Sequence, residues 1–155
     1  MIDIVRIIIS ILLSSLIGVE REKSDKPAGL RTCILVCFTM TIMMILNQKL
    51  LILGRSFDFA RVPSYAIMSV GFLGSGVIIL NRKRLEGITT ASVLLSLVAI
   101  GLLCGMGELI LAGVSTLVVF GVLKLKYVEF IIRKKKPKKK KRKKKNDENK
   151  IHTQS

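Results

Sequence analysis

The chain consists of long apolar runs separated by short polar segments. The runs cover residues 2–19, 32–46, 62–80, 88–105 and 109–125. A run of about 18 apolar residues is long enough to cross a hydrocarbon core roughly 30 Å thick as a helix. The pattern therefore predicts an all-α fold, a polytopic transmembrane helical bundle of about five spans. The far end of the second span is not defined by the pattern, because polar residues 47–49 interrupt it.

Small residues within the apolar runs indicate where the helices meet. Membrane helices pack where small residues let their backbones approach closely. The glycines of the third and fourth runs are Gly71, Gly74, Gly76, Gly101 and Gly105. We predict that these five lie at helix contacts and that residues 105–108 form a tight turn, which makes the last two spans an antiparallel hairpin.

The positive charge is concentrated at the C-terminal end. The formal net charge is +16, and residues 133–155 hold 13 of the 26 Lys and Arg residues. Blocks of like charge repel themselves and stay disordered. We predict a transmembrane domain over residues 1–130 and a lysine-rich disordered cytoplasmic tail over residues 131–155. An anionic leaflet would attract this tail, whereas nucleic-acid binding is disfavoured because no aromatic or folded module accompanies the charge.

Basic residues in the connections predict the orientation. Positive charge near the ends of spans is retained in the cytoplasm. The connections after the first and third spans are rich in Lys and Arg, and the turn after the fourth has none, although the connection after the second also carries three. With the basic tail inside, five spans place the N-terminus outside. We therefore predict a multi-pass membrane protein with its N-terminus outside and its C-terminus in the cytoplasm.

The residues that most enzymes need are scarce. The only histidine is His152, which argues against His-based acid/base catalysis and His metal ligation. No GxxxxGK[ST] sequence is present to hold nucleotide phosphates. We predict a protein that is not an enzyme and has no catalytic, cofactor or metal site.

Two polar segments contain the candidate functional residues. They are Glu20, Arg21, Glu22, Lys26, Pro27, Gly29, Arg31 and Thr32 between the first two spans, and Thr89 and Thr90 at the start of the fourth. One interpretation is structural, with a salt-bridged turn and a threonine cap. The other is functional, with a face that binds a partner protein or an anion. The sequence leaves both open.

Four motifs in this order resemble the MgtC/SapB family of bacterial inner-membrane proteins. They are GVERE at 18–22, KPAGLRT at 26–32, GFLGSGVI at 71–78 and GITTA at 87–91. The resemblance implies a membrane domain of about five helices that modulates other membrane machinery during magnesium limitation or acid stress and is associated with virulence in pathogens. Long members of the family carry a soluble domain after the last span, so this chain resembles a short form.

Three hypotheses for the function follow. The leading one is a non-enzymatic membrane module that binds a partner membrane protein, with a homo-oligomer left open. The alternative is a component of a transport system for Mg²⁺ or another cation. The third is a polybasic tether that binds lipid or nucleic acid through residues 133–155.

Overall fold

The computed structural model describes residues 1–52, 58–81 and 84–134, and places side chains within these ranges except at 79–85 and beyond residue 125. The elements are α1 (Ile2–Lys23), α2 (Leu30–Ile52), α3 (Arg61–Val77), β1 (Ile79–Asn81), β2 (Arg84–Glu86), α4 (Ile88–Met106) and α5 (Leu109–Lys134). The predicted helical membrane-bundle class, with five helices, is confirmed. The chain divides into two units, residues 1–121 and 122–155, and most of the predicted tail lies outside the described residues.

Three of the described helices, α1, α2 and α4, are long and apolar enough to cross a membrane by length and composition. Helix α3 has 17 residues, and the apolar stretch of α5 within the described residues, Leu109–Leu125, is a shorter apolar helix than α1, α2 or α4. A 17-residue helix is about 25 Å long, at the lower limit for a membrane span. The third run of the sequence was predicted to continue to Leu80, whereas the helix ends three residues earlier.

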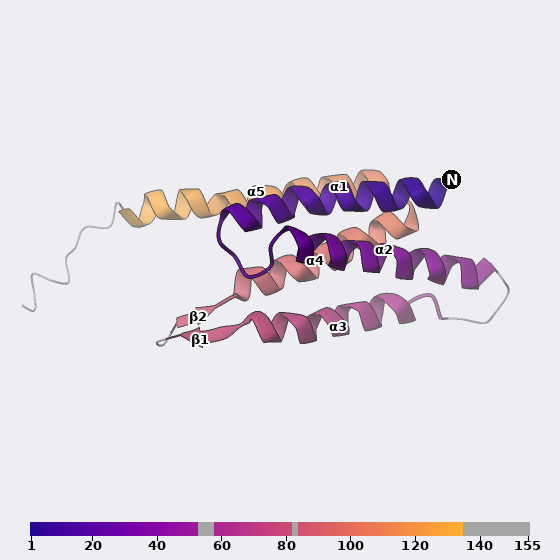
Figure 1. The fold of residues 1–155 in the computed structure, drawn as a ribbon, viewed down its shortest axis with the longest axis horizontal. Coiled ribbons are helices and arrows are strands. Elements are labelled where there is room, and N and C mark those ends of the chain that lie inside the picture. Colours follow the sequence, from indigo (N-terminus) through magenta and orange to yellow (C-terminus); the bar gives the residue numbers. More distant parts are fainter. Residues whose placement is uncertain (53–57, 82–83, 135–155) are drawn as a thin grey trace, which may run out of the picture. The chain divides into compact units, whose positions relative to one another are not determined.

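Helix α4 lies at the centre of the first unit, where it packs against α1, α2 and α3. Figure 1 shows these four helices side by side; successive helices along the chain alternate in direction, so the neighbours α2 and α4 run parallel and α1 and α3 run antiparallel to them. The turn at residues 24–29 and the β1–β2 hairpin consequently lie at the same end, which we call the hairpin end. The start of α1 and the end of α4 lie at the other, which we call the N-terminal end.

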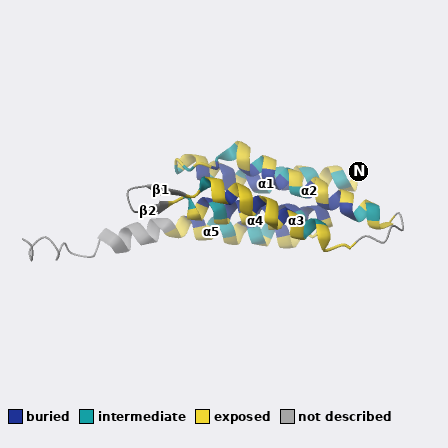
Figure 2. Ribbon diagram, turned by 90° about the horizontal axis from the view of Figure 1, so that it is seen from below, coloured by how far each residue is buried: buried dark blue, intermediate teal, exposed yellow. Residues whose placement is uncertain are grey.

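Helix α1 turns mainly small residues inward, with Ile17 and Arg21 as the large exceptions, and turns large apolar residues outward. Figure 2 shows buried residues on the inner faces of the helices across the bundle. Because lipid tails are as apolar as leucine, packing between membrane helices depends on close approach rather than on water exclusion. In α1 the inward residues include Ser10, Ser14, Ile17 and Gly18, and the outward ones include Ile4, Ile8, Leu12 and Leu16.

Helices α2 and α4 approach each other closely at Gly101 and Gly105. A Cβ atom added to Gly101 would lie 2.6 Å from the carbonyl oxygen of Cys37, and one added to Gly105 would lie 2.5 Å from the Cβ of Met44. The hydroxyl of Thr41 donates to the Gly101 carbonyl at 3.0 Å. Both glycines therefore lie at a helix contact, as their spacing predicts.

The glycines of α3 differ from the prediction. Gly74 is buried, and a Cβ added to it would lie 3.2 Å from the Cβ of Ala91 on α4. At Gly71 and Gly76 an added Cβ would meet no atom within 4 Å. The reason is the helical period: Val70 and Gly74, four residues apart, share the buried stripe, and the other two glycines lie outside it. The expected packing role of Gly71 and Gly76 is therefore wrong within this chain.

An antiparallel hairpin, which the sequence did not predict, connects α3 and α4. Ile79 pairs with Glu86 and Asn81 with Arg84. Gly87 then starts α4 with a φ of 91°, and an added Cβ there would collide with the carbonyl oxygen of Val77. Open strand edges are not found in contact with hydrocarbon. We therefore expect the hairpin to lie at a membrane surface.

Candidate functional site at the hairpin end

Helix α1 ends in a turn held by two backbone hydrogen bonds. The N–H of Lys26 donates to the carbonyl of Arg21 at 3.2 Å. The N–H of Asp25 donates to the carbonyl of Glu22 at 3.1 Å. This is the Schellman arrangement, which places a left-handed residue just beyond the helix. Asp25 takes this position with a φ of 51°, and aspartate is one of the few residues that tolerate it. The backbone thus fixes the direction of the chain into α2.

Glu22 connects the end of α1 to the start of α2. Its Oε2 accepts a hydrogen bond from the N–H of Leu30 at 2.9 Å. The first amides of a helix have no acceptor within the helix, and a carboxylate there also interacts favourably with the helix dipole. A Cβ added to Gly29 would lie 3.1 Å from this oxygen, and one added to Gly18 would lie 2.8 Å from the Cα of Leu30. The predicted motif residues Glu22 and Gly29 therefore shape the turn.

We expect Glu22→Ala to loosen this turn by about 1 kcal/mol, the usual effect of losing a helix cap. The readout is alkylation of Cys33, a buried residue in the first turn of α2. In detergent micelles, peptide mass spectrometry should show Cys33 modified roughly fivefold faster through local opening. Glu22→Gln keeps an acceptor oxygen and should show a smaller increase. An equal increase at Cys104, on α4, would mean global destabilisation and contradict the assigned role.

Arg21 joins α1 to α4. Its side chain is buried, with 3% of the residue exposed, and Nη2 donates to the hydroxyl of Thr90 at 2.5 Å. Within the described residues, Arg21 Nε is buried without a hydrogen-bond partner, as is Oε2 of Glu20. The other oxygen of Glu20 accepts from the hydroxyl of Ser24 at 3.0 Å. The sequence placed Arg21 and Thr90 in separate motifs, and the structure brings them together.

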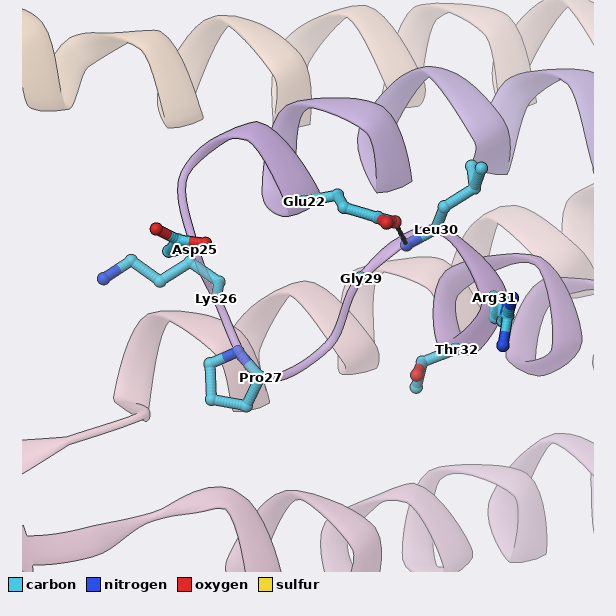
Figure 3. A pocket seen from close by; sticks show the side chains of 8 residues that line it. All are labelled: Glu22, Asp25, Lys26, Pro27, Gly29, Leu30, Arg31 and Thr32. Carbon is cyan, nitrogen blue, oxygen red and sulfur yellow. Dashed lines mark hydrogen bonds between the residues drawn. The ribbon is translucent and has the colours of Figure 1, made fainter.

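The outer surface of the α1–α2 turn contains an open pocket of about 600 Å³. In Figure 3, Asp25 and Lys26 lie on one side of it, and Arg31 and Thr32 lie on the other. The pocket therefore combines acidic and basic groups around one opening. Its lining residues are Glu22, Asp25, Lys26, Pro27, Gly29, Leu30, Arg31 and Thr32. Six of the ten predicted candidates line the pocket, namely Glu22, Lys26, Pro27, Gly29, Arg31 and Thr32. The other four, Glu20, Arg21, Thr89 and Thr90, do not line it.

A second polar cluster, at the N-terminal end, was only partly visible in the sequence. Arg6 Nη1 donates to the carbonyl of Gly105 at 3.1 Å and to the side chain of Gln48 at 3.0 Å. The Gln48 amide in turn donates to the carbonyl of the last residue of α4 at 3.2 Å. Asp3 lies 3.8 Å from Arg6 and 2.7 Å from Lys49. A cation at a helix C-terminus is favourable, so this cluster ties α1 and α2 to the end of α4. Polar residues at the ends of apolar runs were its only signal.

Two other features of the described part of the chain concern metal and thiol chemistry. Among the residues that the structure describes, no group of three or more His, Cys, Asp or Glu side chains is arranged to hold a metal ion. The three cysteines, Cys33, Cys37 and Cys104, are free and buried.

The bundle of long apolar helices, with its two polar clusters at the helix ends, belongs to the class of polytopic helical membrane proteins. The family model of the MgtC family matches residues 7–129. The chain is therefore a member of the MgtC family. No solved structure matches it.

Three relatives illustrate the similarity. "Protein MgtC" from Brucella abortus strain 2308 is 35% identical over 111 residues, which cover 72% of this chain and 45% of the relative. "Protein SapB" from Bacillus subtilis strain 168 is 30% identical over 132 residues, 81% of this chain and 56% of the relative. "Putative magnesium transporter YhiD" from Escherichia coli strain K12 is 34% identical over 109 residues, 67% of this chain and 51% of the relative. The chain thus spans about half the length of these relatives.

Proposed function

We propose that the protein is a non-enzymatic membrane module that binds and modulates a partner membrane protein. The partner would bind at the surface formed by Asp25, Lys26, Arg31 and Thr32, which we call the docking surface. The observation that carries this proposal is the fixed backbone of the α1–α2 turn beneath these side chains.

A preformed surface is suited to binding because little conformational freedom is lost on association. The Schellman turn and the Glu22 cap hold the backbone, while Asp25 and Arg31 are exposed. Both signs of charge occur around the same pocket. Charges of this kind contribute to orientation and choice of partner more than to total affinity.

The membrane setting supports a cytoplasmic docking surface. Basic residues cluster in the sequence at 21–31 and 82–84, both of which belong to the connections of the hairpin end. By the positive-inside rule this end faces the cytoplasm, with the N-terminus of the chain outside. We further propose a role in adaptation to magnesium limitation or acid stress; the name of the relative from Escherichia coli, which includes magnesium, supports the connection with magnesium.

A matched pair of charge reversals tests the docking surface. Arg31 and Arg61 are both exposed and lie in the first turn of a helix, at opposite ends of the bundle. We expect Arg31→Glu to reduce recovery of the partner from solubilised membranes about tenfold, equivalent to roughly 1.4 kcal/mol of binding free energy. Arg61→Glu should leave recovery unchanged. Both variants should insert into the membrane at the level of the unchanged protein.

Two outcomes of this experiment would count against the proposal. Unchanged recovery with Arg31→Glu, or equal losses in both variants, would contradict a specific role for the docking surface. Growth of a deletion strain at low magnesium, complemented with the same two variants, provides the corresponding functional measurement.

A second candidate function is participation in cation transport. It is favoured by the name of the relative from Escherichia coli, which includes magnesium transport. This hypothesis predicts Mg²⁺ flux into liposomes that contain only this protein. Flux at the level of protein-free liposomes would rule out transport by this chain alone.

A further inference from the structure

We propose that the start of α4, together with the buried Arg21, binds a phosphate-type oxyanion. This inference concerns a separate site from the docking surface and does not depend on the partner. It rests on two independent observations, an uncapped helix start and a buried cation beside it that has an unpartnered nitrogen.

The first observation is that no side chain caps α4. Gly87 occupies the cap position, where the structure has no side-chain hydrogen bond to the helix. A residue with a Cβ would collide with the carbonyl of Val77, so a Ser or Asp cap does not fit. The first intrahelical acceptor is the Gly87 carbonyl, which receives the N–H of Ala91 at 2.9 Å. The preceding amides, those of residues 88–90, are the donors that a helix start normally leaves for a cap or a ligand.

The second observation is the position of Arg21. Its guanidinium reaches the first turn of α4 through the Thr90 hydroxyl, and 3% of the residue is exposed. Its Nε is buried without a hydrogen-bond partner in the described part of the chain. A helix N-terminus carries a partial positive charge, so a buried cation beside it is unfavourable unless an anion is close.

Glu20 supplies a negative charge nearby, but neither of its oxygens binds Arg21 in the described structure. One of its oxygens accepts from Ser24, and the other is itself buried without a partner among the described residues. No ion pair between Glu20 and Arg21 is formed within the described structure. Rotation of Glu20 toward Arg21 is the competing explanation, and the experiment below distinguishes the two.

The chemistry of the donors defines the ligand class. Helix amides, a guanidinium and threonine hydroxyls match the oxygens of a phosphate group. Ile88 and Thr89 are exposed, so a ligand can approach the helix start from outside. We expect the β1–β2 hairpin next to this site to lie at a membrane surface, which is the depth of phospholipid headgroups. Both a lipid phosphate and free inorganic phosphate have the required chemistry.

A charge introduced at Thr89 tests the proposal without removing Arg21. Thr89→Glu places a carboxylate in the first turn of α4, where acidic residues stabilise a helix, so the variant should fold. It should compete with the oxyanion and weaken binding about tenfold. Thr89→Gln has the same shape without the charge and should bind nearly as well as the unchanged protein.

Two arms separate the possible sources of the phosphate. In micelles of a phosphate-free detergent, calorimetry measures binding of inorganic phosphate to the full chain. In nanodiscs, native mass spectrometry measures retention of phosphatidylglycerol against an uncharged glycolipid. Loss with Thr89→Glu in the first arm identifies a site for free phosphate, and loss only in the second identifies a lipid headgroup site.

The proposal is overturned if neither probe binds, or if binding of both is the same in the Thr89→Glu and Thr89→Gln variants. In that case rotation of Glu20 accounts for the buried Arg21 without a ligand.

Discussion

Gly105→Ala should lower the free energy of unfolding by about 1–3 kcal/mol, as expected for overpacking a close contact. The added methyl group would lie 2.5 Å from the Cβ of Met44 and 2.7 Å from the carbonyl oxygen of Thr41. Since one of these atoms belongs to the backbone of α2, the two helices must separate. Separation would also stretch the hydrogen bond from Thr41 to Gly101.

The three buried cysteines provide the measurement. All of them are fully buried and free, so a thiol-reactive dye reports unfolding in detergent during a temperature scan. The midpoint should fall by about 2–4 °C for each kcal/mol. Gly71→Ala is the control, because an added Cβ there meets nothing within 4 Å and alanine favours a helix by about 0.5–1 kcal/mol. A fall with Gly71→Ala, or none with Gly105→Ala, would contradict the assigned packing.

The second large effect is expected at Thr90. Thr90→Val preserves the shape of this buried side chain but removes the only hydrogen-bond acceptor that the described structure gives the Arg21 side chain. Leaving a buried charged donor unsatisfied costs roughly 1–3 kcal/mol. The same dye measurement should therefore show a lower unfolding midpoint.

Thr90→Ser separates the hydroxyl from the methyl group. Serine retains the acceptor for Arg21, so most of the lost stability should return. If Thr90→Ser destabilises the protein as much as Thr90→Val, the methyl group rather than the hydrogen bond is responsible, and Arg21 does not join α1 to α4 in the way described.

The helices could be predicted because their signal is local. Apolar runs give the start of α1 and both ends of α4 to within one residue, and the period of four identifies Gly101 and Gly105. Gly71 and Gly76 show the limit of this signal. A small residue favours close approach on whichever face it lies, but the sequence does not say which face has a neighbour.

The ends of the helices could not be predicted in the same way, because distant residues determine them. Residues 47–49 seemed to interrupt the second span, yet α2 continues to Ile52. The side chain of Asn47 donates to the carbonyl of Phe59 at 3.2 Å, and Gln48 bonds to the end of α4. These partners are 12 and 58 residues away along the chain, so composition alone gives no indication of them.

The sequence predicted where the candidate site lies along the chain, but not how its residues are arranged. The charges between the first two spans indicated a polar turn, and the structure divides them by role. Glu22 caps α2, Arg21 is buried against Thr90, and Lys26 and Arg31 line the pocket. The spacing of polar and apolar residues along the chain does not reveal this division, because the division depends on the Schellman turn at Asp25.

Site-specific crosslinking in living cells tests the central claim, that a partner membrane protein binds at the docking surface. A photoreactive phenylalanine would replace Lys26 in one chain and Arg61, at the opposite end, in another. We predict a crosslink to one other membrane protein from position 26, its loss when Arg31→Glu is added, and no such product from position 61. No crosslink from position 26, or the same product from both positions, would contradict the account.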